Sequence, residues 1–133
     1  MRRYMLDTNT VSKAIRGDRP ILHRLVATPM QDVSISAVTE AELRYGLAKR
    51  PEAVGLNRAV LEFLKRVESL TWDSQAALVY GEMRAELERK GRILSPLDLM
   101  IAAHAKCLDL TLVTDDHAFS MVPDLSRETW SQG

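Results

Sequence analysis

The sequence has little cysteine, no long apolar run and no net charge. Cys107 is the only cysteine, so a disulfide scaffold is excluded, and a lone thiol is typical of a reducing cytosol. No apolar run approaches the roughly 20 residues that span a bilayer. Asp7 interrupts the short apolar stretch after the charged N-terminus, which argues against a signal peptide. We therefore expect a cytoplasmic protein that makes no contact with a membrane.

The charge balance removes a common signature of nucleic-acid binding. The chain has 18 Lys and Arg against 18 Asp and Glu, so its formal net charge is zero, and composition alone points away from a polyanionic partner. The chain also lacks internal repeats, low-complexity stretches and Pro-, Gly- or Ser-rich linkers. With 46% hydrophobic residues, these absences indicate one globular domain over residues 1–133.

Short β-rich apolar segments alternate with longer segments of helical periodicity. The pattern predicts buried strands at 4–6, 33–35 and 110–113, and two weaker strands at 70–72 and 129–130. It predicts helices at 10–16, 20–27, 37–49, 52–67, 74–90 and 96–107. Strands joined through helices of this length imply crossover connections. We therefore expect an α/β fold, with a mostly parallel sheet of about five strands flanked by helices on both faces.

Acidic residues follow two of the predicted strands. Asp7 comes directly after the strand at 4–6, and Asp115 and Asp116 follow the strand at 110–113. In open α/β sheets, ligands bind at the carboxyl ends of the strands. A structural role is the alternative, because Asp caps helices well and also serves in turns.

Two further acids lie on predicted helices. Glu42 shares a helical stripe with Val38 and so is expected to face inward, although a salt-bridged surface position is the alternative. Asp98 is followed at helical spacing by Ile101, which places its carboxylate along the buried face. Ser95 with an acid three residues later also resembles a capping box.

One shared site explains these acids more simply than four separate caps. Two carboxylates about 4 Å apart repel by roughly 4 kcal/mol at an effective dielectric constant of about 20, so a cluster needs a cation or a proton. Oxygen-only ligands select Mg²⁺ or Mn²⁺ over zinc, and the sequence has no His and Cys spacing typical of zinc. Such an ion keeps waters and binds phosphate oxygens, which favours phosphodiester chemistry.

Four motifs occur in order: MLDTN at 5–9, ISAVTEAELRYG at 35–46, PLDLMIAAHA at 96–105 and LVTDDHAF at 112–119. A tail with VPDL at 122–125 and ETW at 128–130 follows them. Over nearly the whole chain, this series resembles the PIN-domain ribonucleases, and closely the VapC toxins of bacterial VapBC toxin–antitoxin systems. The resemblance implies a PIN-like domain and a Mg²⁺-dependent endoribonuclease that inhibits growth by cleaving RNA, with tRNA the substrate of several VapC toxins.

The resemblance also implies roles for individual residues. The acids carry over as Asp7, Glu42, Asp98 and one of the pair at 115 and 116. Asp116 fits the family spacing to Thr114 and Phe119, while a longer form of this loop leaves Asp115 open. In the implied mechanism, Asp7 and Asp98 hold Mg²⁺ (or Mn²⁺) most directly, and Glu42 and Asp116 act through water or orient the ion. The supporting residues are Thr8, Asn9 and Thr114.

The family resemblance further implies a VapB-type antitoxin partner and a homodimer. Among the basic residues, Arg44 and Arg84 are the preferred RNA contacts because their helices lie near the motif segments, and most others are expected to be solvated surface. The alternative function is a catalytically weak PIN-fold module that binds RNA or a partner without turnover. The four filled acidic positions favour the enzyme. A dehalogenase-type phosphate enzyme is disfavoured, because Asn9 stands where its second Asp is required.

Overall fold

The computed structural model describes residues 2–131 and has a central five-stranded sheet with the order β3-β2-β1-β4-β5. All its strand pairings are parallel. The strands are β1 Tyr4–Leu6, β2 Val33–Ser36, β3 Glu68–Leu70, β4 Thr111–Val113 and β5 Arg127–Glu128. The helices are α1 Thr8–Ile15, α2 Arg19–Ala27, α3 Ala37–Lys49, α4 Val54–Arg66, α5 Ser74–Arg89 and α6 Pro96–Cys107. The predicted α/β class is confirmed.

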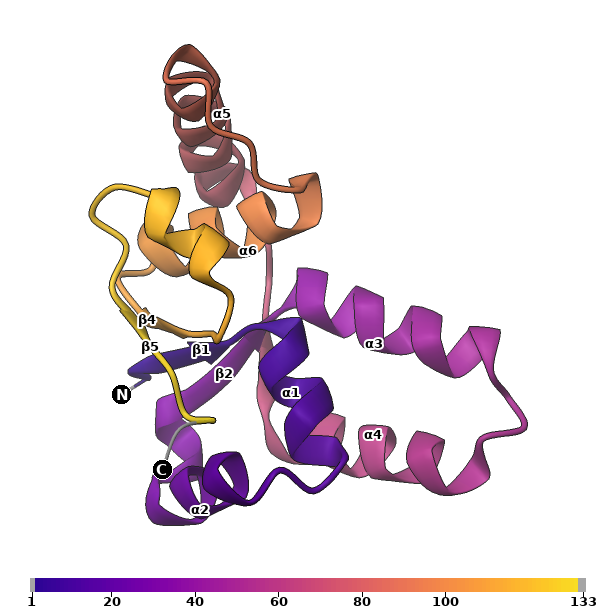
Figure 1. The fold of residues 1–133 in the computed structure, drawn as a ribbon. Helices are drawn as coiled ribbons and strands as arrows, with labels where there is room; N and C mark the ends of the chain where they lie inside the picture. Colours follow the sequence, from indigo (N-terminus) through magenta and orange to yellow (C-terminus); the bar gives the residue numbers. More distant parts are fainter. Residues whose placement is uncertain (1, 132–133) are drawn as a thin grey trace.

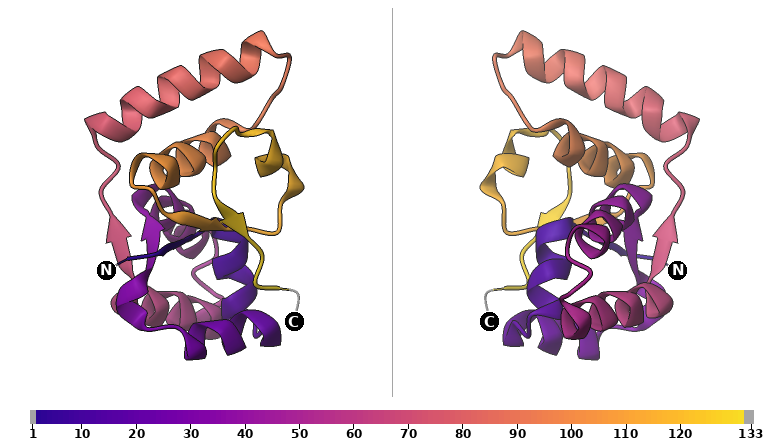
Figure 2. Two further views of the ribbon diagram at one scale, coloured as in Figure 1. Left: turned by 90° about the vertical axis from the view of Figure 1, so that its left-hand side faces the viewer. Right: turned by 90° about the vertical axis from the view of Figure 1, so that its right-hand side faces the viewer.

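Helices cover both faces of the sheet, as predicted. Figure 1 shows α5 and α6 on one side of the sheet and α1, α2 and α4 on the other, and Figure 2 shows the same layers from both sides. Successive side chains of β1 alternate between two apolar cores: Met5 packs with residues of α5 and α6, while Tyr4 and Leu6 pack with residues of α1, α2 and α4. β1 and β4 therefore read as continuous apolar runs, as strands buried on both faces do, whereas in β2 the buried Ser34 and Ser36 alternate with Val33 and Ile35.

Strands are added to opposite sides of β1 in the two halves of the chain. The chain runs from β1 outward to β2 and β3, and then returns to the opposite side of β1 for β4 and β5. Leu6 at the end of β1 pairs with Val113 at the end of β4. The carboxyl ends of β1 and β4 therefore form the switch point at which open parallel sheets bind ligands.

The two edge strands lie two residues earlier than the sequence predicts, at Glu68–Leu70 and Arg127–Glu128. The tryptophans that led to the wrong positions pack through their side chains rather than by strand pairing: Trp72 is partly buried and Trp130 is buried. Trp72 donates its indole N–H to the Met100 carbonyl at 3.0 Å, and Trp130 is fully buried against Tyr4. Across residues 2–131, no helix combines the length and apolar content needed to cross a bilayer.

Candidate active site

Asp7 sits at the switch point and is buried, with 3% of its surface exposed. Its backbone N–H donates to the Val113 carbonyl at 3.0 Å, which joins the ends of β1 and β4. Its carboxylate accepts the Thr10 backbone N–H at Oδ1 (2.8 Å) and the Thr114 hydroxyl at Oδ2 (2.6 Å). Asp7 is therefore the α1 cap that the sequence allowed and also a buried acid at the strand edge.

The Asp7 carboxylate is buried and has no ion-pair partner among residues 2–131. Burial raises its pKa above the ordinary value, hydrogen bonds from Thr114 and Thr10 oppose that shift, and the charge of Asp115 adds to it. No Lys, Arg or His of the described chain forms an ion pair with Asp7. A perturbed acid of this kind at a ligand-binding edge is typical of a functional site.

Glu42 faces the start of α1, in agreement with the predicted inward orientation. The Thr8 hydroxyl donates to Glu42 Oε1 at 2.6 Å and lies 3.1 Å from the Thr39 hydroxyl. Because Thr8 directly follows Asp7, this hydrogen bond holds Glu42 beside the Asp7 segment. Sequence reasoning missed the buried Thr39, although its position three residues before Glu42 places it on the same helical face.

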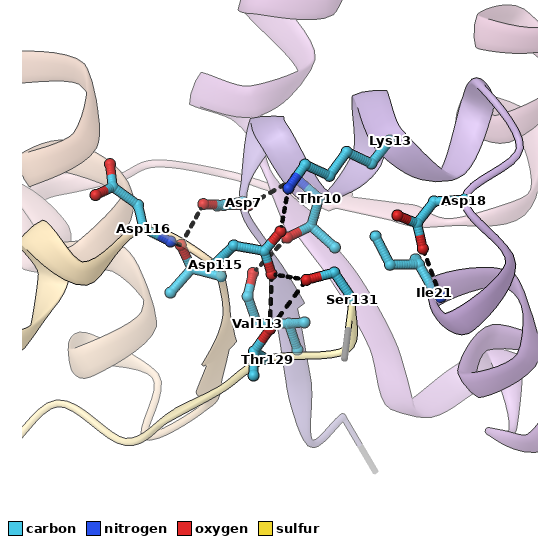
Figure 3. A network of polar contacts seen from close by, with 11 residues as sticks. Asp7, Thr10, Lys13, Asp18, Ile21, Val113, Asp115, Asp116, Thr129 and Ser131 are labelled. Carbon is cyan, nitrogen blue, oxygen red and sulfur yellow. Dashed lines mark hydrogen bonds and ion pairs between the residues drawn. The ribbon is translucent and has the colours of Figure 1, made fainter. Parts of the chain in front are cut away.

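The neighbouring acids Asp115 and Asp116 have different surroundings (Figure 3). Asp115 forms an ion pair with Lys13 and accepts the hydroxyls of Thr129 at 2.7 Å and Ser131 at 2.6 Å. Burial raises the pKa of Asp115, but these hydrogen bonds outweigh it and leave the pKa below its ordinary value. Asp115 thus connects the end of β4 to α1 and to the segment after β5.

Asp116 begins the short 3-10 helix at His117–Met121. Its Oδ1 accepts the Ala118 backbone N–H at 2.9 Å, and its own N–H donates to the Thr114 hydroxyl oxygen at 3.0 Å. Thr114 therefore contacts both Asp7 and Asp116. Within residues 2–131, Oδ2 of Asp116 accepts no hydrogen bond, whereas Asp115 is occupied by three donors.

Asp98 occupies the first turn of α6, where its backbone N–H donates to the Ser95 hydroxyl oxygen at 3.3 Å. This is the Ser95 half of the capping box that the sequence offered as an alternative. The Asp98 carboxylate is half-buried and forms no ion pair within the described chain. Its helix packs against α3, which carries Glu42, and against β4.

The predicted acids are not gathered into one compact group. In the part of the chain that the structure describes, no three His, Cys, Asp or Glu side chains lie close enough together to hold an ion. Two of the acids instead bind neighbouring side chains: Glu42 accepts a hydrogen bond from Thr8, and Asp115 pairs with Lys13. The donors at this edge are carboxylate and hydroxyl oxygens, and Asp7 is a buried acid with no basic partner. This chemistry fits a hard divalent cation.

The structure pairs Arg44 and Arg84 with acids other than the predicted site acids. Arg44 pairs with Glu40 on α3 at 2.7 Å, and Arg84 pairs with Glu88 on α5 at 3.0 Å, both between successive helical turns. Asn9 is exposed on α1. The two arginines preferred from the sequence are thus held by neighbours on their own helices.

His104 is a buried group that sequence reasoning left without a role. Its Nδ1 lies 2.8 Å from the Ser36 hydroxyl, which also accepts the Val38 backbone N–H at the start of α3. Burial lowers the pKa of His104, while a hydrogen bond with the Thr71 backbone and the charge of Asp73 oppose that shift. The neutral ring therefore links α6 to the β2–α3 junction.

His104 is expected to make the fold less stable in acid. Because folding lowers its pKa, the unfolded chain binds more protons than the folded chain just below pH ~6.5. The stabilisation is fully present above that pH and is lost as the pH falls. Urea unfolding between about pH 7.5 and 5.5 should show a shallower decline for His104→Gln than for the parent. Equal slopes would contradict the assignment of a buried neutral ring.

Comparisons with known proteins agree with this architecture. A family model described as PIN domain matches residues 4–125. The tRNA(fMet)-specific endonuclease VapC of Salmonella typhimurium is 39% identical over 98% of this chain and 99% of its own length. Ribonuclease VapC2 of Rickettsia felis is 35% identical over 97% of this chain and 98% of its own length.

Solved structures show the same fold. VapBC2 of Rickettsia felis, bound to a DNA fragment from its promoter, matches with a TM-score of 0.88 and 34% identity over 96% of this chain and 98% of that one. DNA-bound VapBC of Salmonella typhimurium matches with a TM-score of 0.88 and 37% identity over 98% of this chain and 99% of that one. The chain belongs to the PIN domain family, and within it to the VapC ribonucleases.

Proposed function

We propose that this protein is a metal-dependent endoribonuclease that acts as the toxin of a VapBC-type toxin–antitoxin module. The observation that carries the proposal is Asp7, a buried carboxylate at the switch point between β1 and β4 without an ion-pair partner in the described chain. A second candidate, a binding module without turnover, is not favoured, because the acidic positions of the family motifs are all filled.

In this proposal, Asp7 and Asp98 would hold Mg²⁺ or Mn²⁺, and Glu42 and Asp116 would bind through water or orient the ion. When bound, such an ion supplies a Lewis acid that polarises a water and a phosphate oxygen. Thr114 holds Asp7 and the backbone of Asp116 in place, and Thr8 holds Glu42. Asp116 is the better fourth acid, because Asp115 is already occupied by Lys13, Thr129 and Ser131.

We propose tRNA as the substrate class, since the Salmonella typhimurium relative is named a tRNA(fMet)-specific endonuclease. Purified protein incubated with total tRNA and Mg²⁺ is expected to produce discrete fragments. Sequencing their 5′ ends, and those made after induction in living cells, would define the cleavage site. A protein that binds tRNA and leaves it intact under these conditions would be the binding module instead.

We also propose a VapB-type antitoxin as partner, because the structural relatives were solved as VapBC complexes. The supporting feature is a groove of about 430 Å³ between α1, α2 and α4, lined mainly by apolar side chains. Leu22 and Val26 of α2 are exposed in this groove, Val26 with 88% of its surface. An amphipathic segment of the antitoxin could bury them. The homodimer implied by the family resemblance stays a prediction.

Val26→Glu is expected to prevent assembly with the antitoxin. The substitution places a charge in the apolar groove without disturbing the fold, because the side chain is almost fully exposed. Co-expression with the product of an adjacent small reading frame, followed by affinity purification, measures the complex. Val54→Glu, the matched change at an exposed valine at the start of α4 and outside the groove, should retain the complex. Undiminished assembly of Val26→Glu would place the antitoxin elsewhere.

A further inference from the structure

A second groove extends from the acidic edge. It lies between α1, α3 and α4, has a volume of about 300 Å³, and begins at Thr8 and Glu42. Its lining continues along α3 through Tyr45 and Gly46 to Lys49 and Arg50. From Glu42 to Arg50 the chain advances about 12 Å along the helix, the length of three to four nucleotides at the roughly 3.4 Å rise of a stacked strand.

The charge along this groove changes sign away from the acids. Arg16, Lys49 and Arg50 line it, and Glu42, which accepts the Thr8 hydroxyl, is its acidic member. Within residues 2–131 these three basic side chains form no ion pair with an acid, in contrast to Arg44 and Arg84. Their charges are therefore available to a ligand with several negative groups.

An aromatic ring and open space complete the groove. Tyr45 is 66% exposed, and the Lys49 ammonium lies 5.7 Å from the centre of its ring. Next to it, Gly46 occupies a helix interior, where glycine is unfavourable, and an added Cβ there would meet nothing within 4 Å. An exposed ring beside cations is the arrangement on which nucleic-acid bases stack.

We propose that this groove binds the single-stranded RNA segment next to the cleaved phosphate, with Arg16 and Arg50 on the RNA backbone and a base on Tyr45. The inference rests on the proposed function. Continuity with Thr8 and Glu42 favours RNA over an acidic peptide, because the strand would then pass from the groove to Asp7. Arg44 and Arg84, the arginines preferred from the sequence, are replaced in this role by side chains that lack acidic partners.

Binding of a fluorescent single-stranded RNA to Asp7→Asn protein tests the groove independently of cleavage. Adding Arg16→Gln and Arg50→Gln should weaken binding about tenfold and reduce the slope of log K against log salt by about 1.4, because each contact with a single strand contributes about 0.7. The matched control adds Arg19→Gln and Arg89→Gln, the same chemical change at two exposed arginines outside the groove. The control should keep the starting affinity and slope.

Tyr45 is tested by a pair of variants in the same Asp7→Asn protein. Tyr45→Ala should weaken RNA binding at least about fivefold, whereas Tyr45→Phe, which keeps the ring, should not. The inference is overturned if the groove and control arginine variants bind RNA equally, or if a poly-glutamate peptide binds the groove more tightly than RNA. If the groove variants lose RNA while the parent leaves bound RNA uncut, the groove is an RNA-binding surface and the proposed nuclease function fails.

Discussion

Asp7→Asn is expected to abolish RNA cleavage and leave the protein folded. The amide has almost the same shape as the carboxylate and retains an acceptor for Thr10 or Thr114, but it removes the negative charge at the switch point. Since burial raises the pKa of Asp7, the fold itself disfavours the ionised form, so the neutral amide should cost little stability. We expect kcat/KM for tRNA cleavage to fall at least about 10³-fold, with a thermal midpoint that, without divalent ions, is close to that of the parent.

The neighbouring acids provide the controls for this experiment. Asp116→Asn should also impair cleavage, because Asp116 shares Thr114 with Asp7. Asp115→Asn should retain most of the activity but lose about 1–3 kcal/mol of unfolding free energy, because Lys13, Thr129 and Ser131 lose a charged acceptor. The reverse pattern would identify Asp115 as the fourth acid, and an active Asp7→Asn protein would refute the site.

The central fold could be predicted from the sequence because it depends on local patterns. The segments around β1 and β4 are apolar on both faces, and Ser36 and Ser95 cap their helices through hydrogen bonds that span two or three residues. The predicted positions of β3 and β5 are two residues too late, because the nearby tryptophans resemble strand residues but pack through long-range side-chain contacts. Their position depends on residues such as Met100, which a local window does not include.

The side-chain partners at the site could not be predicted in the same way. The sequence prefers Asp116 and leaves Asp115 open, and what separates the two in the structure is Lys13, which pairs with Asp115 from 102 residues earlier in the chain. Thr8 and Glu42 are likewise 34 residues apart in the chain, so a local sequence pattern does not reveal their contact. The zero net charge also does not reveal how charge is distributed over the surface. Pairs such as Arg44 with Glu40 neutralise each other, and the remaining unpaired charges form separate acidic and basic regions.

Removal of divalent ions is expected to stop cleavage completely, and Mg²⁺ or Mn²⁺ should restore it. The reason is electrostatic: Asp7 has no ion-pair partner within residues 2–131, and Lys13 is already paired with Asp115, so a divalent ion is needed to offset the repulsion between the Asp7 carboxylate and an RNA phosphate. Cleavage in EDTA, and after addition of each metal, measures the dependence.

Metal binding should also be visible without RNA. A ligand that binds only the folded state at about 100 times its Kd stabilises it by about 2.7 kcal/mol, so Mg²⁺ should raise the thermal midpoint of the parent. Asp7→Asn should lose this increase, because it removes the buried charge, whereas Asp115→Asn should keep it, because Asp115 is already paired with Lys13. Full activity in EDTA, or equal Mg²⁺ shifts for the parent and Asp7→Asn, would show that Asp7 does not act through a divalent ion.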